Sequence, residues 1–220
     1  MIIIAVVVLL VVAGVFLVLS RFVFQQEEDV VETENGQEET IEEEALAFPL
    51  SEFVIEELSS QAEREFDFAF SKAREWREDS VFYGLLVNYK DQIAREKGNN
   101  TYIFSSPSLP EFYWTLNIEQ AKNEIGEHNF ERIIYYKEDY FLSNNAVAVP
   151  MQYWEWDYMG ALQKADNLGG KDIRSTYGEY DVNVLLSVEE GSYLLWDVEY
   201  VVGGKSIYSL SLNAYNGEIS

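Results

Sequence analysis

An apolar run at the start of the chain constrains its architecture more than any other feature. From Ile2 to Leu19 only Gly14 interrupts the large or small apolar side chains, and Arg21 is the first charged residue. An α-helix rises about 1.5 Å per residue, so about 20 apolar residues cross the hydrocarbon core of a bilayer. The sequence therefore predicts a transmembrane anchor over residues 1–24.

A cleaved signal peptide is the alternative interpretation of this segment. The run is longer than the apolar core of a signal peptide, which is about 7–15 residues, and no small-residue cleavage motif follows it. We therefore predict an uncleaved, single-pass anchor. Charge favours a cytoplasmic C-terminal side, because Arg21 follows the helix and no Lys or Arg precedes it. One basic residue leaves the orientation open.

Residues 25–50 are predicted to form an acidic, disordered tether. Ten Asp and Glu residues lie between Gln25 and Ala47, and no Lys or Arg lies among them. Like charges repel one another, and few apolar residues are available for a core. The tract lacks the alternating Asp spacing and the glycine turn of a calcium loop. A solvated spacer is the prediction, and a cation or a basic partner bound by the tract is the alternative.

Charge and cysteine content exclude several classes of function. The chain has 39 acidic and 15 basic residues, a net charge of −24, and no Cys. Binding to nucleic acid needs clustered Lys and Arg, so this class is excluded. Without Cys, disulfides, thiolate metal sites and thiol catalysis are excluded as well.

The remainder of the chain predicts an α+β fold built from two tandem helix-plus-antiparallel-sheet repeats, residues 51–148 and 149–220. In each, apolar residues at helical spacing come first and strand-like segments follow. The predicted helices are residues 53–77 and 156–167. The predicted strands are residues 81–89, 101–105, 112–118 and 130–142 in the first repeat, and 171–188, 192–202 and 205–214 in the second. Gly203-Gly204 is typical of a two-residue hairpin turn.

Two short sequence matches support an internal repeat. Residues 69–73 (AFSKA) correspond to residues 161–165 (ALQKA), and residues 114–116 (WTL) correspond to residues 196–198 (WDV). The matches occur in the same order in both halves, which is typical of a duplicated unit.

The second repeat resembles a PepSY domain, a small module that also occurs in the propeptides of secreted metallopeptidases. The residues that carry the resemblance are Ala161, Leu162 and Ala165, then Gly169 and Gly170, then Trp196 to Tyr200, and finally Asn213 to Ile219. The first repeat is similar only loosely. Small membrane-anchored bacterial proteins with two cystatin-like repeats are similar in layout. Both resemblances imply a helix packed on an antiparallel sheet, an extracytoplasmic domain in the cell membrane and no catalysis by the domain.

The sequence carries no common catalytic signature, so a non-enzymatic protein without metal or cofactor is predicted. The single histidine, His128, lies in a turn-like segment and has no Cys near it. The candidate binding residues are Tyr153, Trp154, Trp156 and Tyr158, since Trp and Tyr next to acids stack on sugars or peptides. Packing of the two Trp side chains in the core is the alternative. Asp166, Asn167 and Asp172 suggest either a cation loop or a helix end.

We therefore expect a membrane-anchored envelope protein that binds a protein or peptide partner and modulates a peptidase or cell-wall enzyme, as the PepSY resemblance implies. An extracytoplasmic sensor or small-ligand-binding module is the alternative function. A hydrolase with a carboxylate pair is a third, although the sequence selects no such pair.

Overall fold

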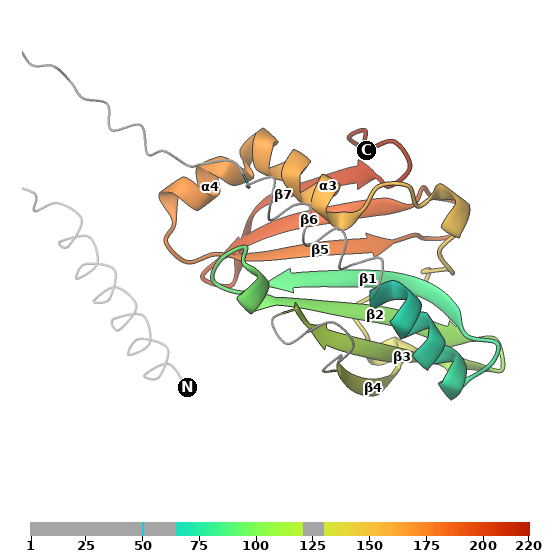
Figure 1. Cartoon of the computed structure of the whole chain (residues 1–220). Helices are drawn as coiled ribbons and strands as arrows, with labels where there is room; N and C mark the ends of the chain where they lie inside the picture. The colour runs from blue at the N-terminus through green and yellow to red at the C-terminus, as the bar shows by residue number, and fades with distance from the viewer. Residues whose placement is uncertain (1–49, 51–64, 121–129) are drawn as a thin grey trace, which may run out of the picture. The chain divides into compact units, whose positions relative to one another are not determined.

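Strands dominate the part of the chain that the structure describes, which comprises residue 50, residues 65–120 and residues 130–220. The structure is a computed structural model (Figure 1). A helix runs through residues 65–76. The remaining elements, in chain order, are β1 (Val81–Tyr89), η1 (Arg95–Lys97), β2 (Gly98–Ser106), β3 (Leu109–Glu119), β4 (Phe130–Tyr136), η3 (Lys137–Asp139), η4 (Met151–Tyr153), α3 (Tyr158–Ala165), the π-helical turn η5 (Asp166–Gly170), α4 (Lys171–Thr176), β5 (Asp181–Ser187), β6 (Leu195–Val202) and β7 (Lys205–Asn213).

The seven strands form one antiparallel sheet in the order β4-β3-β2-β1-β5-β6-β7. Its centre is the pairing of β1 with β5, in register from Leu85 opposite Leu186 to Tyr89 opposite Val182. We call β1 to β4 with the helix of residues 65–76 the first half, and β5 to β7 with α3 and α4 the second half.

The predicted fold class is wrong, because the described residues do not form two tandem helix-plus-antiparallel-sheet repeats. The described residues form a single sheet that runs without a break through both halves, and they belong to one compact unit. Two separate sheets would leave β1 and β5 as edge strands with unpaired backbone N–H and C=O groups. Pairing β1 with β5 satisfies these groups and buries Val87 and Val184 in one core.

The predicted anchor, residues 1–24, lies outside the described residues, and so does the predicted tether, apart from Leu50. Within the described part of the chain, no helix is long and apolar enough to cross a membrane. His128 also lies outside the described residues.

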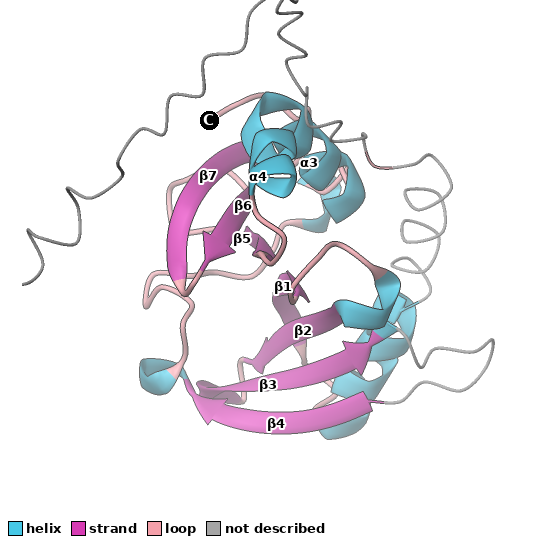
Figure 2. Ribbon diagram, turned by 90° about the vertical axis from the view of Figure 1, so that its left-hand side faces the viewer, coloured by secondary structure: helices cyan, strands magenta, loops and turns pink. Residues whose placement is uncertain are grey.

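The helix of residues 65–76, α3 and α4 cover the same face of the sheet, and Figure 2 shows these three helices on one side of it. Alanines make this contact close, because Ala69 and Ala73 of the first helix and Ala161 and Ala165 of α3 are completely buried. A small side chain lets a helix axis approach the sheet, and large side chains on the strands fill the space between. The largest of these, Trp196 of β6, is also completely buried.

The chain between α3 and β5 differs from the prediction of a strand over residues 171–188. Gly170 adopts helical dihedral angles, φ −60° and ψ −34°, so the chain turns at Gly169 and continues into α4. The strand β5 begins only at Asp181. The Gly169-Gly170 pair is thus a bend between two helical segments and not the end of the helix.

A buried polar network joins the first helix to the sheet. Glu65 is completely buried, and its carboxylate accepts hydrogen bonds from the Asn100 side-chain amide and, at 3.4 Å, from the Tyr102 hydroxyl. Gln120 in turn donates to the Asn100 side-chain oxygen at 2.8 Å and to the Tyr89 hydroxyl at 3.3 Å. Buried polar groups that bond to one another fix a unique arrangement of the elements that carry them. Glu65 therefore sets where the first helix sits on β2.

Candidate functional site

Of the four aromatic residues proposed as a binding site, Tyr158 lies in the core, and Trp154 and Trp156 are partly buried against it. The Trp154 indole donates to the Trp156 backbone oxygen at 3.0 Å, and the Trp196 indole donates to the same oxygen at 2.8 Å. Tyr158 is 1% exposed. The Trp156 ring lies against Gly217, where an added Cβ would come within 2.3 Å of the ring. These side chains hold the segment before α3 against the sheet.

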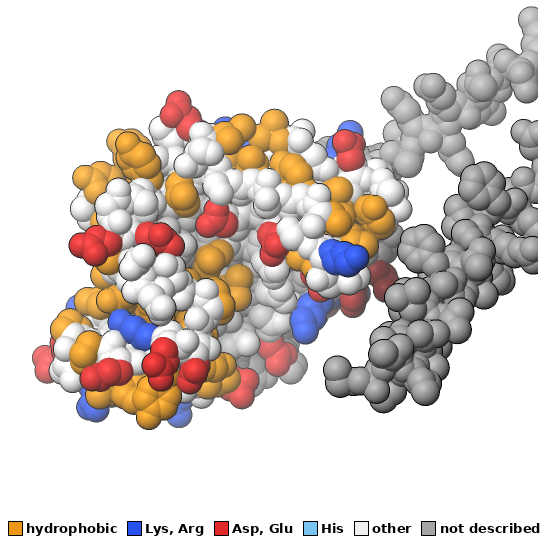
Figure 3. Space-filling view, turned by 180° about the vertical axis from the view of Figure 1, so that it is seen from behind, with side chains coloured by type: hydrophobic (Ala, Val, Ile, Leu, Met, Phe, Trp, Pro, Cys, Tyr) orange, Lys and Arg blue, Asp and Glu red, His pale blue; other side chains and the backbone are white. Residues whose placement is uncertain are grey.

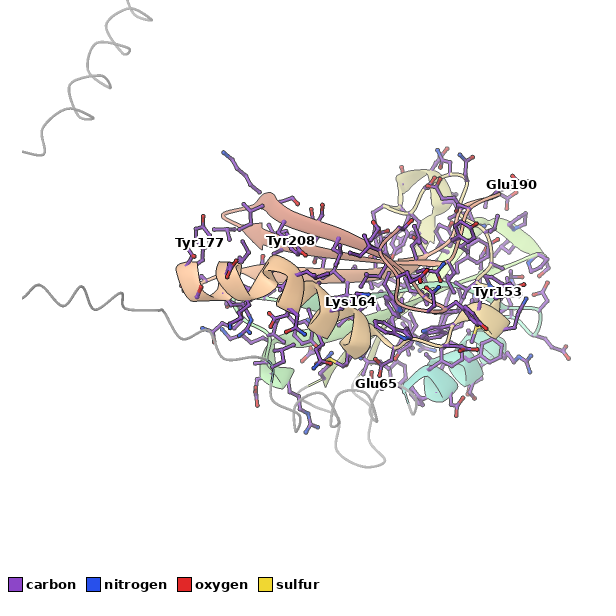
Figure 4. All side chains as sticks on the ribbon, turned by 90° about the horizontal axis from the view of Figure 1, so that it is seen from above. Glu65, Tyr153, Lys164, Tyr177, Glu190 and Tyr208 are labelled. Carbon is purple, nitrogen blue, oxygen red and sulfur yellow. The ribbon has the colours of Figure 1, made fainter. Side chains whose placement is uncertain are left out.

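Only Tyr153 of that set projects into solvent, at the end of the sheet (Figure 4). Its ring makes an edge-to-face contact with the exposed ring of Tyr215, with centroids 6.3 Å apart. Tyr153 and Tyr215 form a small aromatic pair, and both side chains are more exposed than those of Trp154 and Trp156.

The acidic residues around Gly169-Gly170 do not form a cation loop. Asp166 is 1% exposed and accepts two hydrogen bonds from the Arg174 guanidinium, at 2.6 and 2.8 Å. The hydrogen bond and the charge of Asp166 raise the pKa of Arg174. Among the described residues, no group of three or more His, Asp or Glu side chains could hold a metal ion. Asp166 therefore joins η5 to α4.

A groove beside the edge strand β4 is the site that the sequence analysis missed. It has a volume of about 390 Å³ and lies between the helix of residues 65–76 and strands β3 and β4. Six side chains line it: Lys72, Glu75 and Trp76 from the helix, Trp114 from β3, and Arg132 and Ile134 from β4.

The groove exists because β4 extends beyond the first helix. Phe130, Arg132, Ile134 and Tyr136 pair with residues of β3 that face the helices, so they point to the helix-bearing side of the sheet. Phe68 of the first helix contacts Phe130, with ring centroids 5.3 Å apart, whereas Ile134 and Tyr136 are 52% and 54% exposed. This row of alternate β4 residues is apolar except for Arg132.

Two tryptophans form the inner wall of the groove. The Trp76 and Trp114 rings are stacked, with centroids 6.1 Å apart and an angle of 15° between their planes. Trp114 is 3% exposed, while Trp76 is half-buried. At the end of the row, the centroid of the Tyr136 ring lies 4.6 Å from the centroid of the Phe112 ring. A stacked aromatic wall with an open side offers apolar contact area to a ligand without a large entropy cost.

Charged side chains border this wall. Lys72 and Glu75 form an ion pair at 2.7 Å on the helix. The Arg132 guanidinium lies 5.8 Å from the centre of the Phe130 ring, and none of the described acidic residues pairs with it. Arg77, 6.0 Å above the Trp76 ring, likewise has no described acidic partner. The groove is therefore locally basic in a chain of net charge −24.

The backbone of β4 is also available at this place. β4 pairs with β3 on one side, and no strand in the described part of the chain pairs with its other side. Alternate N–H and C=O groups of an edge strand point outward, ready to pair with another strand. The outer edge of β4 and the groove thus lie next to each other.

The opposite face of the sheet carries a second, smaller aromatic group. The Lys137 ammonium lies over the rings of Tyr83 and Tyr113, at 4.5 and 4.8 Å from their centres. Burial lowers the pKa of Lys137 and raises that of Tyr113 to about 12. In the view from behind, orange side chains gather at the lower end of the molecule and acidic side chains are scattered over the face (Figure 3). Lys137 thus already makes the cation–π contact with both tyrosines.

Comparison with known proteins identifies no relative. No family model, no curated protein and no solved structure matches the chain. The resemblance to PepSY domains therefore stays a prediction, and the site must be judged on its own geometry.

Proposed function

We propose that this chain is a membrane-tethered binding protein that takes up an extended segment of a partner protein along the outer edge of β4. The observation that carries the proposal is the exposed row of Phe130, Ile134 and Tyr136 beside a strand edge that no described strand pairs with. A peptide that adds a strand to a sheet gains affinity from backbone hydrogen bonds and specificity from pockets for alternate side chains. β4 provides the edge, and the groove is a pocket for one such side chain.

The character of β4 supports this reading. Proteins usually protect an edge strand with charges, proline or a covering segment, because a long apolar edge pairs with other chains. β4 has seven residues, of which only Glu131 and Arg132 are charged. It contains no proline, and its apolar row is exposed. Such an edge is suited to a partner strand of about the same length, roughly 23 Å at 3.3 Å per residue.

The cellular setting of the proposal comes from the sequence. Residues 1–24 would anchor the chain in the cell membrane, residues 25–50 would tether the domain, and the domain would lie on the extracytoplasmic side. The partner would be an envelope protein, such as the peptidase or cell-wall enzyme that the PepSY resemblance implies. A tether of about 25 residues has a span of about 25–30 Å, which keeps the domain near membrane-bound partners.

The alternative function, a sensor or small-ligand-binding module, has one observation in its favour. Tyr153 and Tyr215 form an exposed aromatic pair at the end of the sheet. Tyr158 is buried, and Trp154 and Trp156 pack against the core, so these three side chains are not part of the pair. A pair of rings with no cavity between them provides less contact area than the groove at β4, so peptide binding is the better supported function.

Selection of peptides tests the proposal. The full chain, immobilised in detergent micelles, is exposed to a phage-displayed library of random 12-residue peptides. We expect enriched peptides with alternating apolar residues, and we expect Ile134→Asp to abolish their binding. The matched control is Ile207→Asp on β7, at a residue that is 39% exposed, which should leave binding unchanged. Enriched peptides that bind the Ile134→Asp variant as well as the parent chain would refute the site.

A further inference from the structure

We propose that the groove beside β4 selects a partner segment that carries an acidic residue, whose carboxylate pairs with Arg132. The inference rests on the proposed binding of an extended segment at β4 and adds to it the chemistry of one side chain. It commits to an acidic peptide segment of another protein as the occupant of the groove.

The first argument is the unsatisfied charge of Arg132. The groove side chains carry two positive charges, Lys72 and Arg132, and one negative charge, Glu75. Glu75 is already paired with Lys72 at 2.7 Å. Arg132 is exposed, and no described acidic residue pairs with it, although the chain has 39 acidic residues. A guanidinium binds a carboxylate through two parallel hydrogen bonds, a geometry that ammonium groups do not offer.

The second argument is the location of Arg132 on the strand. Arg132 lies opposite Leu116 of β3, and Ile134 lies opposite Trp114, so both side chains point to the helix-bearing side. In a peptide paired with β4, alternate side chains point to that same side, one spacing of about 4.8 Å farther from β3. A partner residue beside Arg132 therefore lies within reach of its guanidinium, and apolar residues beside Phe130 and Ile134 meet apolar side chains.

The third argument is the apolar surroundings of the groove. Trp114 and Trp76 form its wall, and Phe130 lies under the Arg132 guanidinium. Attraction between opposite charges increases where apolar groups displace water, since the local dielectric constant falls. A carboxylate in this groove gains more than it would beside an arginine on an open surface.

Other occupants are distinguishable by experiment. The chain has its own acidic tract between Gln25 and Ala47, whose carboxylates share the chemistry of an acidic partner. If this tract filled the groove, its removal would increase the binding of added peptides. If no acid were needed, binding would depend on apolar residues alone and would not respond to a change of charge at Arg132.

A charge exchange tests the inference. The probe is the random 12-residue phage library, selected against the full chain, the Arg132→Glu variant and a matched control, Lys205→Glu. Lys205 lies at the start of β7, at the other edge of the sheet, and undergoes the same change of charge. We expect Asp or Glu at a constant place in peptides selected by the parent chain and the control, and Lys or Arg there with Arg132→Glu. Far-ultraviolet circular dichroism confirms that each variant is folded, and Arg132→Gln provides a second variant.

Synthetic peptides then give the size of the effect. In the best peptide, exchange of its acidic residue for the amide should weaken binding to the parent chain about 10-fold or more, and binding to Arg132→Gln by less than about 3-fold. The same consensus from the parent chain and Arg132→Glu would overturn the inference and leave binding at β4 standing. No enrichment with any variant would overturn both. Enrichment only after deletion of residues 25–47 would assign the groove to the chain's own tract and overturn the choice of an external partner.

Discussion

The two halves of the sheet place a tryptophan strand next to an edge strand, but only one of the two edges is covered. In the first half Trp114 of β3 lies opposite Ile134 of β4, and in the second half Trp196 of β6 lies opposite Leu212 of β7. Leu212 is completely buried, whereas Ile134 is 52% exposed. Two features make the difference: the helices above the second half, and the C-terminal residues, since Ile219 forms a β-bridge with Leu212.

Glycine explains how the second half is covered. The α3-η5-α4 segment bends over β6 and β7 because Gly169 and Gly170 have no side chains. A Cβ at Gly169 would lie 2.8 Å from the Tyr208 ring, and one at Gly170 would lie 2.4 Å from the Tyr200 ring. In the first half, the helix of residues 65–76 reaches the start of β4, where Phe68 contacts Phe130, and leaves Ile134 and Tyr136 exposed. The exposure of Ile134 and Tyr136 therefore follows from the reach of the first helix, and it is the basis of the proposed binding site.

Truncation of the two matched residues should give the largest contrast in stability. Leu212→Ala removes a buried side chain and should lower the free energy of unfolding by about 2–5 kcal/mol. Ile134→Ala removes a half-exposed one and should cost about 1 kcal/mol or less. Urea unfolding followed by circular dichroism measures both. Equal losses would show that Ile134 is as well packed as Leu212, which would remove the basis for a site at β4.

Alkaline pH should weaken the junction of the two halves. Burial raises the pKa of Tyr89 from 10.0 to about 12. The folded state therefore keeps a proton that the unfolded state loses above pH 10. The contribution of Tyr89 is fully present below about pH 10 and is lost as the pH rises through about 12, a loss of about 2–3 kcal/mol.

The variant Tyr89→Phe checks this pH dependence. It should cost about 1 kcal/mol at pH 7, because the hydrogen bond from Gln120 is lost. Between pH 10 and 12 its stability should fall less steeply than that of the parent chain. Tyr136→Phe, at an exposed tyrosine of β4, is the control and should keep the steep fall. A parallel fall in Tyr89→Phe and the parent chain would refute the role of Tyr89.

A methyl group at the bend of the second half should produce a smaller loss. Gly170→Ala places a Cβ 2.4 Å from the completely buried Tyr200 ring and should cost about 1–3 kcal/mol. Gly178→Ala is the control, since no atom lies within 4 Å of its added Cβ, and it should change stability by about 0.5 kcal/mol or less. A neutral Gly170→Ala would mean that close approach at this glycine does not hold the helices over β6 and β7.

Local patterns predicted much of the fold, and contacts distant in the sequence supplied the rest. The strand predicted over residues 81–89 coincides with β1, and Gly203 and Gly204 form the predicted turn between β6 and β7, both with positive φ. The pairing of β1 with β5 was missed, because no local pattern encodes which strands become neighbours. The groove was missed for a related reason: Trp76 and Trp114 meet only when the helix lies on β3. The apolar residues on both faces of the β4 sequence were the one signal available for it, and it was not used.

Amide hydrogen exchange of β4, with and without a selected peptide, tests the central claim most directly. In the full chain in detergent micelles, nuclear magnetic resonance follows the backbone amides of Phe130–Tyr136 and of Lys205–Asn213. We predict that a saturating selected peptide slows exchange at alternate β4 amides, those that point away from β3, by about 10-fold or more, while β7 is unchanged. Binding of the peptide without any slowing in β4, or with slowing in β7 instead, would contradict the account.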